Sequence, residues 1–193
     1  MELRAAHVKK YFELRVGAPD EMMEKILATD LEIIRRRAVN LGVLEGDLTL
    51  NPIQIMLPDH FLEEDLLYRL DTHKKVSTLR YTQAALTTLF YDETRLYYHQ
   101  CNLDVVTGDI SDDVFGEFAF VDVVTMETFL TDGPEEDPNF IRLDLEIQLT
   151  NGAEFILTLR RHPSTRDYVM DPLLTESEQA ILRTLKTLVR NTV

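Results

Sequence analysis

The chain has 193 residues, of which 45% are hydrophobic and 28% are charged, a composition that excludes disorder over the whole chain. No apolar run approaches the roughly 18–20 residues that span a bilayer, and the N-terminus lacks the apolar segment of a secretory signal. The single cysteine, Cys101, excludes an internal disulfide and favours a reducing compartment. We therefore expect a cytoplasmic protein, or a domain on the cytoplasmic side of a membrane.

Negative charge is concentrated in the middle of the chain. The formal net charge is −14, and most of it lies between Arg95 and Arg142, a stretch without Lys or Arg. Its acidic residues are Asp104, Asp109, Asp112, Asp113, Glu117, Asp122, Glu127, Asp132, Glu135, Glu136 and Asp137. Such a field repels nucleic-acid phosphates and anionic lipid headgroups, and it favours a basic partner, a cation or simply solubility. We therefore expect no nucleic-acid partner.

Residues 17–42 have the pattern of a helix. Pro19, Asp20 and Glu21 suit its first turn, since proline costs little there and carboxylates meet the positive end of the helix dipole. Gly42 is a typical stop. Apolar residues at helical spacing form one stripe, which consists of Met23, Leu27, Leu31, Ile34, Ala38 and Leu41.

Three consecutive arginines, Arg35, Arg36 and Arg37, lie on this helix. They point over roughly 200° of its circumference, so they do not form one phosphate-binding patch. We interpret them as a solvated face, and pairing with the acidic sheet segment is the alternative.

The segment after this helix predicts one strand and one short helix. In residues 53–57, Ile53, Ile55 and Leu57 alternate with Gln54 and Met56, which indicates an extended segment. Proline-containing turn signals lie on both sides of it. Residues 59–71 predict a short helix with Asp59 as its N-cap and Leu62, Leu66 and Leu70 on one side.

From Val76 onwards the sequence is rich in Thr, Tyr, Leu and Val, which favour β-strands. Polar residues 92–94 predict a hairpin turn between two strands, and a further strand is expected in "GEFAFVDVVTMETFL", residues 116–130. Residues 141–149 alternate between apolar and polar, which is typical of a strand with one dry face. The Asn-Gly pair at 151–152 then predicts a tight hairpin.

The chain closes with a predicted amphipathic helix. Thr175 and Glu178 have the spacing of a capping box. The apolar stripe consists of Leu174, Ile181, Leu185, Leu188 and Val189. A single amphipathic helix after antiparallel strands must bury this stripe against the sheet.

This order of elements resembles the pleckstrin-homology-like (PH-like) fold, in particular bacterial PH-like and GRAM-like domains. The segments that carry the resemblance are "LTTLFYDETRLYYHQ", "FAFVDVVTMET", "LEIQLTNGAEFILTL" and "ESEQAILRTLKTLV", within residues 76–193. The resemblance implies an α+β protein with an antiparallel sandwich or barrel and a closing C-terminal helix. We expect residues 1–75 to be a mainly helical N-terminal segment packed on that sheet.

The resemblance also implies a binding or scaffolding module, because the fold serves mostly recognition and rarely catalysis. Phosphoinositide-binding members hold phosphates with a basic loop near the start of the sheet. Here the early loops carry Asp92, Glu93 and the acidic stretch from Asp104 to Glu117, so phosphoinositide binding is not expected.

The stretch "CNLDVVTGDISDDVFGEF", residues 101–118, fails as a calcium loop. In an EF-type loop that starts at Asp109, glycine is required at the sixth position and a bidentate Glu at the twelfth. These positions hold Val114 and Phe120. We interpret the stretch as a solvated acidic loop between strands, and we predict no metal site and no cofactor.

His99 and Cys101 share one face of a predicted strand with Tyr97. A Cys–His pair is nucleophilic where a carboxylate orients the histidine, but no flanking motif marks such a pair here. A lone buried cysteine is typically an inert small hydrophobe. His60 and Glu64 have helical i, i+4 spacing without a third metal ligand. Known catalytic signatures are absent from the sequence, so we assign no catalytic residue.

We therefore predict a non-enzymatic binding or regulatory module that recognises a protein partner, of basic character, through an acidic surface or a sheet edge. The candidate partner-binding residues are Asp104, Asp109, Asp112, Asp113 and Glu117. A peripheral membrane-associated domain, with its basic N-terminal helix facing the bilayer, is the alternative. An enzyme that uses Cys101 with His99 is the third hypothesis.

Overall fold

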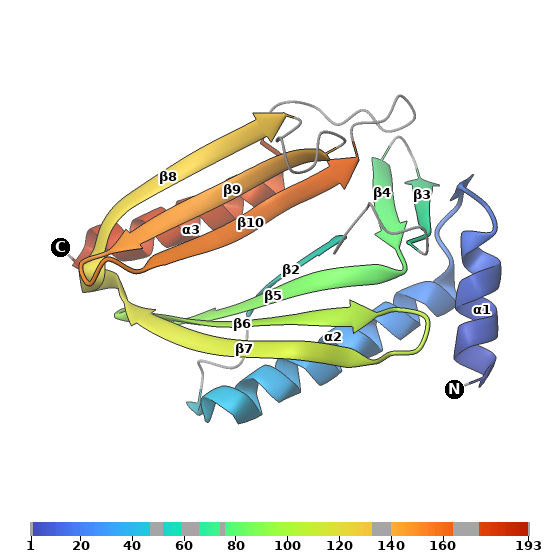
Figure 1. Ribbon diagram of the computed structural model, residues 1–193, viewed down its shortest axis with the longest axis horizontal. Coiled ribbons are helices and arrows are strands. Elements are labelled where there is room, and N and C mark those ends of the chain that lie inside the picture. Colours follow the sequence, from blue (N-terminus) through green and yellow to red (C-terminus); the bar gives the residue numbers. More distant parts are fainter. Residues whose placement is uncertain are drawn as a thin grey trace.

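Two antiparallel sheets face each other in the middle of the molecule, and their strands converge where the chain passes from one sheet to the other (Figure 1). The structure is a computed structural model that describes residues 2–46, 52–58, 66–73, 76–132, 140–163 and 174–192. Among these residues, no helix combines the length and the apolar character needed to cross a membrane.

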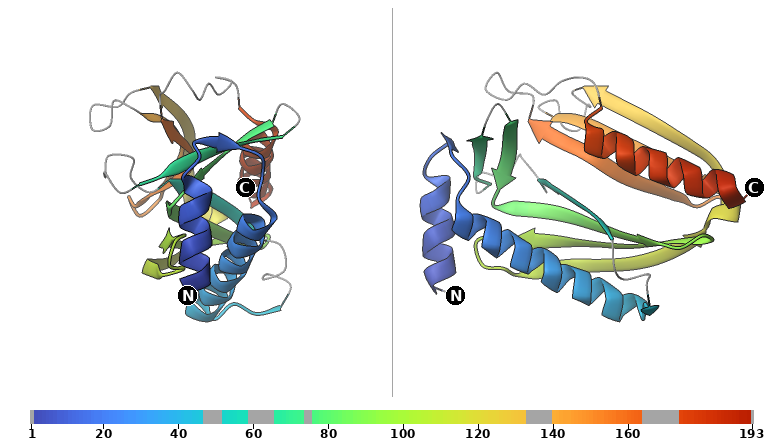
Figure 2. Two further views of the ribbon diagram at one scale, coloured as in Figure 1. Left: turned by 90° about the vertical axis from the view of Figure 1, so that its right-hand side faces the viewer. Right: turned by 180° about the vertical axis from the view of Figure 1, so that it is seen from behind.

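Helix α1 (Glu2–Phe12) leads through the short strand β1 (Val16–Gly17) to the long helix α2 (Glu21–Gly42). The predicted helix is confirmed, and Asp20 is its N-cap: the Asp20 carboxylate accepts the Met23 N–H at 2.8 Å. Met23, Leu27, Ile34 and Ala38 of the predicted stripe are buried. α2 lies along the four-stranded sheet in two opposite views (Figures 1 and 2).

Gly42 ends α2 as predicted, but it is not the residue that adopts the left-handed conformation at the end of the helix. The residue with positive φ is Val43, at 50°, and its N–H bonds back to the carbonyls of the last turn. A Cβ on Gly42 would overlap the ring of Phe115, which packs directly on the helix. Glycine is therefore needed here for close approach to the sheet.

Strand β3 (Tyr68–His73) replaces the second half of the helix predicted over residues 59–71. It pairs with β4 (Val76–Tyr81) and, in parallel, with β1. The helix prediction followed leucines spaced by four, whereas the chain here alternates with period two and buries Arg69 and Asp71. Arg69 Nε donates to Asp71 at 3.0 Å, and Tyr11 donates to the same carboxylate. Residues 59–65 lie outside the described residues.

The central sheet has the order β2-β5-β6-β7. Its strands are β2 (Ile53–Pro58), β5 (Gln83–Tyr91), β6 (Arg95–Asp104) and β7 (Ile110–Ala119). The hairpin predicted at residues 92–94 is confirmed: the Asp92 carboxylate accepts the N–H groups of Thr94 and Arg95. Because β2 pairs with β5, the first 75 residues contribute a strand to this sheet. The division into two parts at residue 75 stays a prediction.

The second large sheet has the order β10-β9-β8 and follows the 3₁₀-helix η2 (Phe120–Asp122). Its strands are β8 (Val123–Asp132), β9 (Phe140–Leu149) and β10 (Glu154–Pro163). The predicted Asn-Gly hairpin joins β9 to β10, with Gly152 at φ +80°. Helix α3 (Glu176–Thr192) confirms the closing helix and its capping box: the Thr175 N–H donates to Glu178 at 2.7 Å, and the Glu178 N–H donates to Thr175 Oγ1 at 3.3 Å.

One large core joins the two sheets to α3. Strand residues of both sheets, among them Leu89, Leu96, Leu145 and Leu157, pack with Leu182 and Leu185 of α3. A separate core packs α1 and α2 against the other end of the central sheet. The α+β class, the antiparallel sheets and the C-terminal helix are thus confirmed, and the sheets do not close into a barrel. Membership of the PH-like fold stays a prediction.

Candidate functional site

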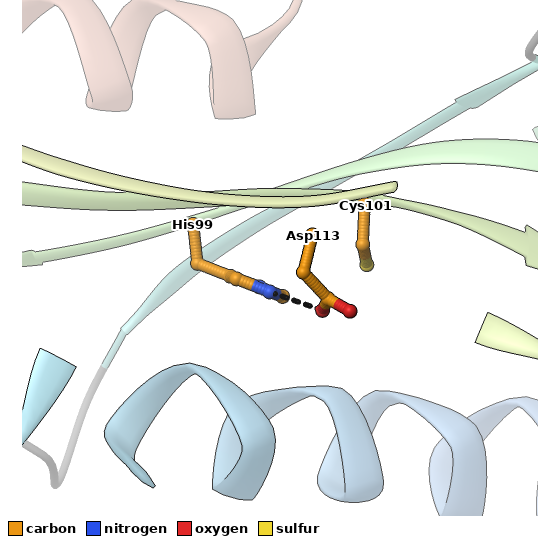
Figure 3. A group of neighbouring side chains, drawn as sticks. All are labelled: His99, Cys101 and Asp113. Atoms are coloured by element: carbon orange, nitrogen blue, oxygen red, sulfur yellow. Dashed lines mark hydrogen bonds and ion pairs between the residues drawn. The ribbon is translucent and has the colours of Figure 1, made fainter. Parts of the chain in front are cut away.

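Three side chains with metal-binding and nucleophilic chemistry meet between the central sheet and α2. They are His99 and Cys101 of β6 and Asp113 of β7, and one ligand atom from each lies within 4.8 Å of the others. Figure 3 shows all three side chains extending from the sheet toward the helix. His99 and Cys101 share a face because they are two residues apart on a strand. We call this group the His–Cys–Asp cluster.

A β-bulge in β7 shapes this cluster. Gln100 is opposite Val114 and Asn102 is opposite Ser111, so two residues of β7 face Cys101 alone. One of them, Asp112, has a φ of +56°, in the left-handed region that Asp adopts more readily than most residues. Asp113 shares the helix side of β7 with Phe115 by alternation, and the extra residue returns Ile110 to the apolar core on that side.

Asp113 connects the sheet to α2. Its Oδ1 accepts a hydrogen bond from His99 Nε2 at 2.8 Å, and its Oδ2 pairs with the Arg37 guanidinium. His99 is fully buried, Cys101 is 3% exposed, and the Asp113 side chain is 15% exposed. Arg37 is 45% exposed and closes the cluster on its solvent side. Pairing with the acidic sheet segment, the alternative considered for the three arginines, is therefore confirmed for Arg37. Arg35 and Arg36 pair with Glu32 instead.

Two buried polar atoms at the cluster have no hydrogen-bond partner among the described residues. They are His99 Nδ1 and Thr88 Oγ1, and Thr88 lies directly opposite His99 in the pairing of β5 with β6. Buried polar groups are nearly always hydrogen-bonded, and an exception marks strain, function or an additional bound group.

The electrostatics of the cluster keep Asp113 charged and Cys101 neutral. Burial acts to raise the pKa of Asp113, but the hydrogen bond from His99 and the pair with Arg37 outweigh it and hold that pKa below its ordinary value. Burial, with a smaller contribution from the Asp113 charge, raises the pKa of Cys101 to about 12. The thiol is therefore protonated at neutral pH, which disfavours its use as a nucleophile.

The acidic stretch predicted as a loop is largely a strand. Asp112, Asp113 and Glu117 lie on β7, so the loop interpretation is wrong for them. The low β-propensity of Asp and Gly and the broken alternation at the bulge conceal this strand in the sequence. Asp113 turns inward, and Glu117 pairs with Arg95 at 2.8 Å.

The other two predicted residues flank the β6–β7 turn. Asp104 accepts the N–H groups of Val106 and Thr107, and Asp109 is exposed. Asp112 is exposed as well and accepts a hydrogen bond from Asn102. Asp104, Asp109 and Asp112 thus gather at one end of the sheet, while Glu117 lies toward the other end of β7. Their role in partner binding stays a prediction.

A second candidate surface is the outer face of the β8-β9-β10 sheet, which we call the outer sheet face. It has a shallow hollow of about 280 Å³, which is lined by Phe129, Thr131, Arg142, Asp144, Glu146 and Ile156. Phe129 and Ile156 are each 43% exposed, so the described residues leave this face uncovered. The core between the sheets lies on the opposite face, with Leu143, Leu145 and Ile147 of β9.

Carboxylates that form no ion pair with a described residue, Glu127 and Glu146, accompany the apolar residues on the outer sheet face. Glu127 lies directly opposite Glu146 in the β8–β9 register, a like-charge pair that is unfavourable across strands. A hydrogen bond with Glu146 raises the pKa of the neighbouring Glu154. Arg142 is held by Asp144 at 2.6 Å. The face therefore combines apolar contact area with concentrated negative charge.

A larger hollow, of about 380 Å³, lies between β2, β4, β10 and the start of α3. Its floor carries the buried ion pair of Arg160 with Glu178, in which Arg160 Nε donates to Glu178 at 2.7 Å. Because Glu178 also caps α3, this pair fixes the helix to the sheet. The pair has a clear structural role in holding α3.

No protein family, curated protein or solved structure matches the chain.

Proposed function

We propose that the protein is a non-catalytic recognition module that binds a basic, partly apolar segment of another protein on the outer sheet face. The observation that carries the proposal is the coexistence of exposed Phe129 and Ile156 with the facing carboxylates of Glu127 and Glu146. Apolar residues supply contact area, and the uncompensated charge selects a cationic partner.

Charge complementarity argues for this occupant. Bringing Lys or Arg side chains between Glu127 and Glu146 relieves the repulsion that the free sheet carries. The side chains of Phe129 and Ile156 offer apolar contact beside them, which suits a segment that alternates basic and apolar residues. An acidic or purely apolar partner would leave this charge uncompensated.

Photo-crosslinking in the native cell identifies the partner. A photoreactive phenylalanine analogue replaces Phe129, and the control carries it at Val114 of β7, which is exposed to a similar degree. The expected result is a protein captured from position 129 and not from position 114. Capture from position 114 alone would contradict the proposal and favour the acidic β6–β7 turn instead.

The affinity of the purified captured protein then tests the chemistry. Glu127→Gln with Glu146→Gln is expected to weaken binding about 10- to 100-fold, with the loss reduced at high salt. The matched control, Asp109→Asn with Asp112→Asn, is expected to change binding less than about twofold. Because the first pair removes a repulsion, it does not lower folding stability, so weaker binding cannot come from unfolding. An unchanged affinity in that variant would reject the proposed surface.

Flotation with anionic vesicles tests the membrane alternative. The negative charge of the chain predicts no flotation. Binding to such vesicles without a protein partner would contradict the proposal.

A further inference from the structure

We propose that the His–Cys–Asp cluster is a binding site for a divalent transition metal, with Zn²⁺ as the ion that fits its ligands best. Three different ligand groups from two adjacent strands converge within 4.8 Å of one another between the sheet and α2. Neither the recognition function proposed above nor the sequence assigns a metal to this place.

The ligand set points to zinc. Thiolate, imidazole and carboxylate are the three side-chain groups that bind Zn²⁺, whereas Ca²⁺ and Mg²⁺ require oxygen ligands. Bonds of about 2.0–2.3 Å in a tetrahedral arrangement separate the ligand atoms by roughly 3.3–3.8 Å. The ligand atoms lie within 4.8 Å of one another, so the widest separation closes by about 1–1.5 Å. The His99 Nε2 and Asp113 Oδ1 atoms, at 2.8 Å, open by about 0.5 Å to admit the ion. A fourth position remains for water.

Two buried polar atoms beside the cluster have no hydrogen-bond partner among the described residues, an exception that calls for an explanation. A histidine that binds a metal through one nitrogen nearly always donates its other N–H to a hydrogen-bond acceptor. In His99 the Nε2 atom faces Asp113, while Nδ1 is buried and has no partner among the described residues. Thr88, opposite His99 on β5, carries the second unpartnered buried atom, a hydroxyl oxygen. Metal binding through Nε2 moves the imidazole proton to Nδ1, on the side of the ring away from the metal.

Charge and protons balance in this step. The Cys101 thiol releases its proton to water and becomes a thiolate, while the His99 proton moves from Nε2 to Nδ1. The dication then meets two negative ligands, Cys101 and Asp113, and the site is neutral. Arg37, which compensates Asp113 in the structure, is 45% exposed and is released to solvent. Arg37 and the metal therefore compete for one carboxylate.

A hydrogen-bond network that only stabilises the fold would show the same contacts without a metal. The test must therefore distinguish a metal site from such a network. Co²⁺ is the probe, because a cobalt–thiolate bond gives a charge-transfer absorption band that a protein without such a bond lacks. Metal-free protein, prepared with a chelator, is titrated with Co²⁺ and then with Zn²⁺. The expected result is saturation at one Co²⁺ per chain, with the band abolished by Zn²⁺ and retained in excess Mg²⁺. The absence of a saturable thiolate band at micromolar Co²⁺ would overturn the proposal.

Variants identify the ligands and exclude unfolding. Cys101→Ala is expected to keep the metal-free melting temperature within a few degrees and to lose the rise in melting temperature that Zn²⁺ gives the wild type. The double variant Asp109→Asn with Asp112→Asn, at exposed carboxylates beside the cluster, is expected to bind Co²⁺ as the wild type does. A Zn²⁺-dependent rise that persists in Cys101→Ala would contradict the assignment.

Arg37→Gln provides a readout that a structural role would not produce. Removing the competing cation is expected to tighten Co²⁺ binding about tenfold, even though it removes an ion pair and lowers metal-free stability. Weaker or unchanged Co²⁺ affinity in this variant would count against the competition between Arg37 and the metal, and against the site.

Discussion

His99 of β6 donates a hydrogen bond from Nε2 to Asp113 of β7 at 2.8 Å, and the same carboxylate holds Arg37 of α2. The two strands and the helix thus share this polar contact, which lies between two clusters of packed apolar side chains. On one side of this contact Ala38 and Phe90 pack together, and on the other Cys101 and Leu103 join the core of α1 and α2.

Removing the shared carboxylate should destabilise the fold. Asp113→Ala leaves His99 fully buried without its acceptor, so the free energy of unfolding is expected to fall by about 1–3 kcal/mol in urea titrations. Asp112→Asn is the matched control, because that side chain is exposed and Asn also adopts the left-handed conformation. A control within about 0.5 kcal/mol of the wild type is expected. Equal losses in both variants would contradict the role of Asp113.

The Arg160–Glu178 pair should be more sensitive than the surface pairs. Both side chains are buried, and Glu178 also accepts the Thr175 N–H at the start of α3. Glu178→Ala leaves Arg160 without its carboxylate and is expected to cost about 3–5 kcal/mol. Glu176→Ala, two residues away on the exposed side of the same turn, should cost less than about 1 kcal/mol. Denaturant midpoints of the two variants give the comparison, and a small loss for Glu178→Ala would refute the anchoring role.

Stability should decline at acid pH. Burial acts to raise the pKa of Asp113, but its hydrogen bond with His99 outweighs burial and holds the pKa below the ordinary value of 3.8. Burial acts in the same way on Glu178, and the pair with Arg160 holds that pKa below the ordinary value of 4.5. These carboxyls bind protons more weakly in the folded than in the unfolded chain. Their contribution to folding stability is therefore complete at pH values above the ordinary pKa values. It is lost as the pH falls through the lower pKa values of the folded chain. Unfolding free energies measured across this range should fall less steeply in Glu178→Gln, and an identical slope would contradict the assignment.

Cys101 should be unreactive in the folded, metal-free protein. Burial raises its pKa to about 12, so little thiolate is present at neutral pH, and the side chain is 3% exposed. Its alkylation by iodoacetamide is expected to be at least about 100-fold slower than in urea. Rapid alkylation under native conditions would revive the hypothesis of a Cys–His enzyme.

The end of α2 gives a pair of substitutions with opposite signs. Val43→Gly is expected to stabilise the protein by roughly 1 kcal/mol, because Val43 is exposed and has a positive φ that glycine adopts without strain. Gly42→Ala is expected to destabilise it by about 1–3 kcal/mol, because the added methyl overlaps the Phe115 ring. Thermal melts of the two variants check both signs. Stabilisation by Gly42→Ala would show that the helix and the sheet approach each other less closely.

The elements with regular local patterns could be predicted from the sequence. The stripe of α2, the alternation of β9, the Asn-Gly hairpin and the Thr175–Glu178 capping box each depend on residues close together in the chain. Strand β3 could not be predicted in this way, because the residues on its buried face are charged, namely Arg69 and Asp71. Their burial depends on a contact with Tyr11 of α1, which is far away in the sequence.

The candidate sites were less accessible to sequence reasoning. His99 and Cys101 were recognised as sharing a strand face, but Asp113 joins them through the pairing of β6 with β7, whose register the sequence does not show. The outer sheet face was missed because its residues are spread over three strands. The alternation of β9 indicated a wet face, while the facing of Glu127 and Glu146 depends on the β8–β9 register, which a long connection leaves open.

Residue-resolved mapping of amide chemical shifts, as the partner's basic segment is titrated into the labelled protein, tests the recognition function most directly. The amide shifts are expected to concentrate on the outer sheet face, at residues 125–131, 142–148 and 154–158, and to disappear in the variant with Glu127→Gln and Glu146→Gln. Shifts centred on the β6–β7 turn, at residues 104–112, with β8, β9 and β10 unaffected, would contradict it.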